Sequence, residues 1–500
     1  MGGVEPRHRR EPPSLLRYVQ ALLRYVQSVP RARRASRKGF LASRMQDPLF
    51  WTILVFLVLG LMAAFLFSEP VQLPDTPTYV PLPGQNAFAQ VNLLGNAQRP
   101  WIVTLPYALI KNDNLIVLMQ SAFSLASWGA LLWASSFLRI RSHVLTWTVR
   151  IIIGSIGLSS LVIQWNPLLQ SDSLAMSGAV LLVAGFLVAS SKKPVAGLLL
   201  LVVGALIVSQ IRIITAIPIV LIAALLLVAP VRRVVRGRAG SVKSLVPVAM
   251  ASCVLILIVV YGISLDNRQD VHWGNEVVPG LNIHGRTLQQ VGVIDAVPEG
   301  NLAIHDILTS EGFKCLQGEF PLGKPGTYWN PTVVRKCPRQ SKLFSEQFLS
   351  KYAAWILHHP RLVATSLIGP FNQGFSIPDA KTFLSLTPDS VSALWATGSS
   401  GADPVVLELG LLVAGAAWMA IRRRPGAQQV LGFTILACGG VASVIVTVIA
   451  SPLDTQRVAS APAMIARLFV IFGVIIFCDR YLSSRRTNHP ASNQQTPVTG

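Results

Sequence analysis

Five ionisable residues stand beside the apolar runs of the chain, and their side chains could do chemistry together. They are Asp75, Asp172, Arg212, Asp454 and Arg457. A carboxylate can take a proton from a hydroxyl group as that group attacks a sugar carbon. An arginine can bind a phosphate in fork geometry and stabilise it as it leaves. These residue types favour transfer of a group from a phosphate, provided that the fold brings them to one place.

Each of these residues alone also has a structural explanation. Asp172 can cap the start of a helix, and Asp454 and Arg457 are three positions apart, so they can pair on one helical face. A charge in the middle of a bilayer costs roughly 2.5–3.5 kcal/mol on insertion scales, so ionisable groups close to membrane helices need a reason. Because the residues of one active site must share a membrane face, the topology of the chain tests their common role.

The composition is that of a polytopic membrane protein. Of the 500 residues, 52% are hydrophobic and 13% are charged, against about 25% charged in a typical soluble domain. The net charge is +21, but the basic residues lie in short connectors and at the N-terminus, where they report membrane orientation. The aromatic residues lie in apolar runs rather than among the basic clusters, so we expect no nucleic-acid partner.

About ten apolar runs approach the twenty residues that cross a bilayer. They lie near Leu49–Phe67, Leu115–Phe137, Leu145–Ile163, Leu174–Ala189, Val195–Val208, Ile214–Val228, Val246–Ile263, Val405–Ile421, Val430–Ala450 and Ala463–Cys478. Basic clusters occupy alternate connectors, and with ten spans they all fall on one side, which the positive-inside rule makes cytoplasmic. We therefore expect an all-α polytopic protein of the plasma membrane with both termini in the cytoplasm.

The runs divide the chain into five parts. These are a basic cytoplasmic tail (1–47), an N-terminal membrane domain of about seven helices (48–264) with a long first outer loop (69–113), an extracytoplasmic loop domain (265–403), three C-terminal membrane helices (404–480) and a second cytoplasmic tail (481–500). All five candidate residues then fall on the outer face.

The extracytoplasmic segment is long enough to form a small mixed domain over the membrane. Near its end, Phe344–Leu367 has helical spacing that includes a His358-His359-Pro360 stop. Cys315 and Cys337 share this segment, and their spacing fits no zinc signature. In an oxidising compartment they would form a disulfide that contributes about 3 kcal/mol. The histidines show no ligand spacing, so no metal is indicated and no cofactor is expected.

The order of the motifs along the chain resembles that in the GT-C superfamily of integral-membrane glycosyltransferases. A basic tail and a first span precede an outer loop that contains Asp75-x-x-x-Tyr79 and Gly95-x-x-x-Arg99-Pro100. The run from Ser171 to Leu174 resembles the start of a later helix in many bacterial members. The resemblance covers most of Leu49–Asp479. It implies a GT-C-like fold and a polyprenyl-phosphate sugar as donor.

The resemblance also implies site roles. The candidate site comprises catalytic Asp75 and Asp172, phosphate-binding Arg212, Arg457 and Arg99, and substrate-positioning Tyr79 and Asp454. Asp75 would act as general base or would orient the acceptor. Many members carry a second acid close to the first, whereas the next acid here is Asp113, and Asp172 would fill that role. Some members use a divalent metal, which nothing in this sequence specifies.

We expect transfer of a sugar, with inversion, from the lipid-linked donor to an extracytoplasmic lipid, glycan or protein in assembly of a bacterial cell envelope. A lipid-linked glycan polymerase or ligase stays open and would depend on arginines rather than on Asp75. A transporter or flippase would need charged residues inside helices and broken helices in paired repeats, and the short runs that flank Arg212 are the one feature that favours it. A catalytically inactive scaffold would share the same topology.

Overall fold

The structure is a computed structural model of the 500-residue chain. It describes residues 48–67, 69–72, 76, 79, 86, 88, 91–94, 99–138, 140–191, 194–235, 241–277, 302–318, 336–375, 404–422, 424, 426–450 and 455–487. The chain divides into two units, Met1–Thr52 and Ile53–Gly500, and the architecture below is that of the second. Within the described residues this unit is all-helical, apart from one isolated parallel bridge between Val71 and Leu168.

Five of the described helices contain a stretch that is long and apolar enough to cross a membrane. They are α5 (Asp113–Ser135), α8 (Asp172–Ala189), α11 (Ser241–Val277), α20 (Ala427–Ala450) and α21 (Thr455–Thr487). Their apolar stretches run from 18 to 26 residues, which matches the roughly 20 residues that span a hydrocarbon core. The protein is therefore a multi-pass membrane protein.

Five further apolar stretches are shorter than these. They belong to α3 (Pro48–Phe67), α6 (His143–Gly157), α9 (Pro194–Ile211), η3 (Ile213–Thr215) with α10 (Ala216–Val235), and α19 (Pro404–Ile421). Short connecting helices α4 (Trp101–Leu109) and α7 (Ser160–Ile163) complete this part of the chain. The ten apolar runs of the sequence are largely helical, although the run Leu145–Ile163 is interrupted between α6 and α7. Because only five are long enough to span by length and composition, the ten-span topology stays a prediction.

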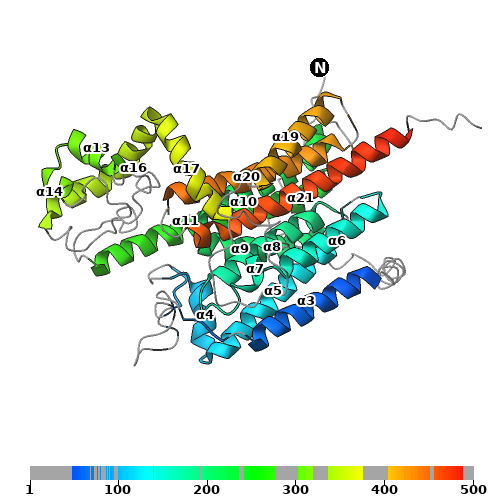
Figure 1. Ribbon diagram of the computed structural model, residues 1–500, viewed down its shortest axis with the longest axis horizontal. Coiled ribbons are helices and arrows are strands. Elements are labelled where there is room, and N and C mark those ends of the chain that lie inside the picture. The colour runs from blue at the N-terminus through cyan, green and yellow to red at the C-terminus, as the bar shows by residue number, and fades with distance from the viewer. Residues whose placement is uncertain are drawn as a thin grey trace, which may run out of the picture. The chain divides into compact units, whose positions relative to one another are not determined.

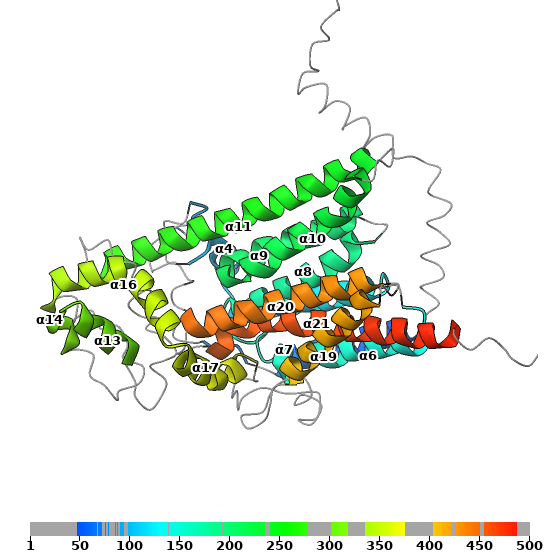
Figure 2. The same cartoon turned by 90° about the horizontal axis from the view of Figure 1, so that it is seen from above.

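Helix α8 is the buried centre of the helical bundle. Every residue from Asp172 to Val188 is buried, and the helix contacts α5, α9 and α21 (Figures 1 and 2). Its Phe186 ring lies 6.2 Å from that of Phe433 and 5.7 Å from that of Phe469. A helix that is apolar on all sides is expected to be buried on all sides. The composition of α8 thus explains its central place.

Helices at the periphery instead expose large apolar side chains. Phe56 of α3 is 59% exposed and Leu257 of α11 is 64% exposed. Lipid tails are as apolar as these side chains, so the exposure carries no penalty within a bilayer. The contrast with α8 separates the lipid-facing helices from the core.

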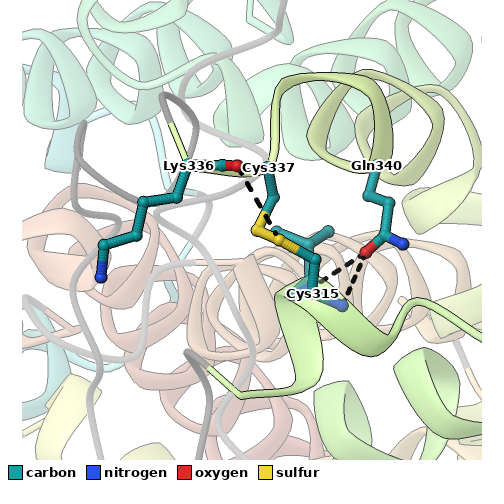
Figure 3. The surroundings of a disulfide bond; sticks show 5 residues. Cys315, Lys336, Cys337 and Gln340 are labelled. Carbon is teal, nitrogen blue, oxygen red and sulfur yellow. Dashed lines mark hydrogen bonds between the residues drawn. A yellow bond between two sulfur atoms is a disulfide. The ribbon is translucent and has the colours of Figure 1, made fainter.

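The segment between α11 and α19 contains four described helices: α13 (Leu302–Ser310), α14 (Lys314–Gln317), α16 (Pro338–His358) and α17 (Pro360–Phe375). A disulfide joins Cys315 to Cys337, whose Cα atoms are 6.0 Å apart (Figure 3). Beside it, Oε1 of Gln340 accepts hydrogen bonds from the backbone N–H groups of Cys315 and Leu316, at 3.0 and 3.2 Å. These links hold α14 against the start of α16.

The helix expected over Phe344–Leu367 is two helices that meet at His359. That residue leaves helical geometry, with φ −121° and ψ 48°, and Pro360 begins α17. Proline lacks the N–H that a continuous helix would need here, and it disfavours helical geometry in the residue before it. Helix α17 then packs against α20 and α21, where Arg467 donates a hydrogen bond to the carbonyl oxygen of Phe375.

Candidate functional site

The centre of the candidate site is an ion pair between α8 and the turn that follows α9. Asp172 is the first residue of α8 and is 1% exposed. Arg212 lies between α9 and η3, and its Nη2 group donates a hydrogen bond to Oδ1 of Asp172. The structure thus joins two residues for which the sequence predicted different roles. In a buried pair, each charge compensates the loss of solvation of the other.

Close packing of α8 against α9 determines where these residues meet. A Cβ atom built on Gly185 would lie 2.5 Å from the backbone nitrogen of Leu201, and one on Gly204 would lie 2.6 Å from that of Leu182. Only glycine permits backbones to approach so closely. Both contacts fit one antiparallel alignment of α8 with α9. When this alignment is extended to the start of α8, Asp172 lies level with the residues that follow Ile211.

The turn that leads into α8 is itself buried, from Gln164 to Ser173. Val71 and Thr76 of the first outer loop lie against it. The N–H of Val71 donates to Pro167 at 2.9 Å, and the N–H of Leu169 donates to Val71 at 3.0 Å. The hydroxyl of Thr76 donates to the carbonyl of Leu169, also at 3.0 Å. Most turns are exposed. A turn that is buried beneath a loop therefore indicates that its polar groups are held inside the protein for a purpose.

Two tyrosines stack beside this turn. The ring centroids of Tyr79 and Tyr107 are 5.5 Å apart, and the Arg99 guanidinium lies 5.2 Å from the Tyr79 centroid. Both rings belong to a buried apolar cluster. Burial raises the pKa of the Tyr107 phenol, and the nearby Tyr79, Asp113 and Asp172 raise it further by charge repulsion. Tyr107 is therefore a neutral hydrogen-bond donor at neutral pH.

Buried polar atoms without a hydrogen-bond partner in the described part of the chain gather around the ion pair. They include Oδ2 of Asp172, Nε of Arg212, the Tyr107 hydroxyl and both amide atoms of Gln210. Neighbouring elements add Gln120 Oε1, Ser121 Oγ, Gln164 Nε2, Trp165 Nε1, Asn166 Nδ2, Gln170 Oε1 and Ser209 Oγ. Each unpaired buried group costs about 1–3 kcal/mol. So many in one region indicate a place for water or a polar ligand.

These groups could hold an anion and a hydroxyl group side by side. Arg212 Nε and the Tyr107 hydroxyl are donors, Asp172 Oδ2 is an acceptor, and the Gln210 amide is both. A phosphate needs donors, and a sugar hydroxyl needs an acceptor for its proton. The polar set can serve both kinds of group.

The other predicted site residues are described only in part. Asp75 and Asp454 lie outside the described residues. Arg457 belongs to the first turn of α21, and its side chain also lies outside them. Helix α21 contacts both α8 and η3. The structure therefore brings Asp172 to Arg212 and Tyr79 to Arg99, while the roles of all seven residues stay predictions.

Sequence reasoning missed several polar residues of this region. No role was predicted for Tyr107, Gln120 or Gln210. In the structure, the Gln120 amide donates to the carbonyl of Gln170 at 3.0 Å. One signal was available: an amide side chain inside an otherwise apolar run needs a polar partner. Gln120 meets that description, whereas Gln210 lies just after the run that ends at Val208. Tyr107 carried no comparable signal, because a tyrosine near a membrane helix is commonly interfacial.

No group of three or more His, Cys, Asp or Glu side chains suited to a metal ion occurs among the described residues. The chain matches no protein-family profile, no curated protein and no solved structure. A functional assignment therefore depends on the residues of the site and on the short motifs of the sequence.

Proposed function

We propose that the protein transfers a sugar from a polyprenyl-phosphate donor to an extracytoplasmic acceptor. The observation that carries the proposal is the buried Asp172–Arg212 pair, surrounded by polar atoms that have no described partner. The pair lies where α8 begins and α9 ends. A lipid-linked phosphate would lie at the same level, where the hydrocarbon core meets water. The GT-C-like motifs around Asp75 and Asp172 support the same class of reaction.

Arg212 would bind the phosphate of the donor. A guanidinium has five N–H donors. Nη2 donates to Asp172, Nη1 donates to the carbonyl of Ile211 at 3.3 Å, and Nε has no described partner. The remaining N–H groups can bind phosphate oxygens and stabilise the charge that develops on the leaving phosphate. Arg457 and Arg99 remain further candidates for the same role.

A carboxylate would take the proton of the attacking hydroxyl. The hydroxyl oxygen forms a bond to the anomeric carbon, and the bond from that carbon to the phosphate oxygen breaks. Its electron pair leaves with the polyprenyl phosphate, and the proton passes to Asp75 as general base. Asp172, through Oδ2, would orient the acceptor, with Tyr79 and Asp454 as candidates for positioning the substrate. Attack opposite the leaving group inverts the sugar carbon.

The topology of the proposal follows from the basic clusters. With ten spans, the two termini are cytoplasmic, and the first outer loop and the segment 265–403 lie outside the inner membrane of a bacterium. The GT-C-like architecture would then place the site where a lipid-linked donor and an envelope acceptor meet.

The test is transfer by the purified protein in liposomes. The donors are radiolabelled polyprenyl-phosphate mannose, glucose and galactose, and the acceptor is a delipidated envelope fraction. Asp75→Asn should abolish transfer, and Asp172→Asn should lower it by about 100-fold or more, which is the usual contribution of a proton-transfer or orienting carboxylate. Transfer that survives Asp75→Asn at the full rate would remove Asp75 from the mechanism.

Asp113→Asn is the matched control for these variants. Oδ2 of Asp113 accepts a hydrogen bond from the Gln72 side chain at 3.1 Å, and an asparagine oxygen can accept the same bond. We expect this variant to transfer at the original rate. An equal loss in all three variants would show that this region of the protein tolerates no change of charge, and it would contradict specific roles for Asp75 and Asp172.

One observation favours a second candidate, a transporter or flippase for a lipid-linked sugar. The chain leaves helical geometry at Arg212, between α9 and η3, and a buried ion pair lies at this interruption. Interrupted helices that carry charges are typical of transport sites. Movement of the labelled lipid across liposomes without an acceptor, lost in Arg212→Lys, would support transport instead of transfer.

A further inference from the structure

A second concave site lies in the segment between α11 and α19, where α13 meets the last turns of α16. It encloses about 240 Å³, less than the roughly 300–1,000 Å³ of pockets for drug-sized ligands. It is lined by Asp306, Ile307, Ser310, Lys351, Trp355 and His359. We call it the α13–α16 pocket. Its size suits one small ring rather than a chain.

Polar contacts between α13 and α16 build the pocket. The indole N–H of Trp355 donates to Oδ2 of Asp306 at 3.1 Å. Lys351 pairs with Glu311, just beyond the end of α13. The His359 ring stacks on the indole with centroids 4.3 Å apart. The disulfide and the Gln340 contacts join α14, which follows α13, to the start of α16 (Figure 3), so α16 is held to this part of the chain at two places.

The pocket offers both hydrogen-bond acceptors and donors, because Asp306, His359 and Lys351 line it and Lys351 has three N–H groups, of which one donates to Glu311. Asp306 uses Oδ2 for the indole, which leaves Oδ1 for a second donor. Nδ1 of His359 lies 2.9 Å from the carbonyl oxygen of Trp355. A carbonyl only accepts, so this nitrogen carries a proton, and Nε2 is the ring atom that is left for a ligand. Hydroxyl groups, which both donate and accept, can bind all of these groups.

The same contacts argue for binding rather than catalysis in this pocket. Ser310 donates its hydroxyl proton to the carbonyl of Ile307 in its own helix, at 3.0 Å. His359 uses Nδ1 for a backbone carbonyl, and Asp306 is bound to an indole. A serine nucleophile would need the imidazole as its base and a carboxylate behind that imidazole. A serine, a histidine and a carboxylate are all present, but their described hydrogen bonds go to other groups and not to one another.

We propose that the α13–α16 pocket binds one neutral sugar ring of the acceptor, which makes the acceptor a glycan. Sugar hydroxyls supply the donors that Asp306 and His359 need, and the ring carbons suit the wall formed by Ile307 and Trp355. The charged residues of the lining are one acid, Asp306, and one base, Lys351, so the lining as a whole favours neither an anion nor a cation. The role as an acceptor site rests on the proposed function, whereas the binding of a sugar does not.

Binding is measured without turnover, so that the pocket is tested apart from the transfer reaction. The full chain is labelled with 5-fluorotryptophan and placed in nanodiscs, because many detergents carry sugar headgroups. The protein has 11 tryptophans, and the fluorine signal that disappears in Trp355→Phe is that of Trp355. Methyl glucoside, methyl mannoside and methyl galactoside are titrated separately, with glucosamine and glucose 6-phosphate as charged counterparts.

We expect at least one neutral glycoside to shift the Trp355 signal in a saturable way. Asp306→Asn should weaken that binding by about tenfold or more, because hydrogen bonds to a charged acceptor are the stronger ones. Asp113→Asn is the control: it also removes one negative charge, but Asp113 is the first residue of α5 and lies outside this segment. It should change the dissociation constant less than about twofold.

Three outcomes would overturn the proposal. The first is an unchanged Trp355 signal with every neutral glycoside, and the second is tighter binding of a charged sugar. The third is an equal loss in Asp306→Asn and Asp113→Asn. A second variant, His359→Gln, keeps a hydrogen-bonding side chain and can be used if the Asp306 variant fails to fold. It should also weaken glycoside binding. If transfer fails in liposomes while the glycoside still binds, the pocket stands and the proposed function falls.

Discussion

The two polar regions of this protein each contain an acid–base pair, yet the two pairs carry different weight. Asp172 and Arg212 have side chains that are 1% and 13% exposed, whereas Glu311 and Lys351 are 30% and 41% exposed. An exposed pair contributes about 0–1 kcal/mol. Removing one member of a buried pair costs about 3–5 kcal/mol, because the other charge stays buried alone. An acid–base pair therefore contributes strongly to stability at Asp172–Arg212 and little at Glu311–Lys351.

The two regions also differ in what holds them in place. Glycine contacts between α8 and α9 set the helix register that brings Asp172 to Arg212. The segment with the α13–α16 pocket instead has a disulfide and side chains that bridge α13 and α16. Packing of membrane helices gains little from the hydrophobic effect and depends on close contact, whereas the segment with the pocket has a covalent link.

The largest effect is expected where the buried pair is broken. Arg212→Ala leaves the Asp172 carboxylate buried without a counterion and should lower the free energy of unfolding by about 3–5 kcal/mol. Thermal unfolding of the detergent-solubilised protein measures the loss. Lys351→Ala removes the base of the exposed pair and should cost no more than about 1 kcal/mol.

A neutral double variant sharpens this test. Asp172→Asn with Arg212→Gln removes both charges and should recover most of the stability that Arg212→Ala loses, but not sugar transfer. If Arg212→Ala and Lys351→Ala were equally stable, the pair at the start of α8 would not be buried in the way described. If the double variant transferred sugar normally, neither side chain would take part in the reaction.

A smaller effect is expected from the disulfide, and in only one of the two regions. Replacing Cys315 and Cys337 by serine removes a link worth about 3 kcal/mol. Hydrogen exchange in α13 and α16 should accelerate by about two orders of magnitude, while exchange in α8 stays the same. Cys253→Ser, at a free and exposed cysteine, is the control and should change neither region. Equal protection of α13 with and without the link would show that Gln340 and Trp355 suffice to hold it.

The sequence located the helices well but not the contacts between them. Apolar runs mark membrane helices because a bilayer imposes length and composition on each helix separately. The end of α16 could also be predicted, because Pro360 has no backbone N–H and disfavours helical geometry in the residue before it. Asp172 and Arg212 are 40 positions apart, and Asp306 and Trp355 are 49 apart. Their meeting depends on helix register and on a disulfide-linked fold, which residue types alone do not encode. Tyr107 became visible as a candidate only once its burial beside Asp172 was known.

The smallest expected effect tests the helix register itself. Gly185→Ala places a Cβ atom 2.5 Å from the backbone nitrogen of Leu201, so α8 and α9 must move apart. Overpacking of this kind costs about 1–3 kcal/mol. Gly432→Ala, in α20, is the matched control, because a Cβ atom there would meet nothing within 4 Å.

If the register brings Asp172 to Arg212, Gly185→Ala should also lower sugar transfer, although Gly185 is more than three helical turns from the acid. The Gly432 variant should keep both stability and transfer. A Gly185 variant that loses stability but transfers sugar at the full rate would mean that the ion pair tolerates a shift of its two helices. In that case the buried pair would be a feature of the fold, and the chemistry would belong to the first outer loop alone.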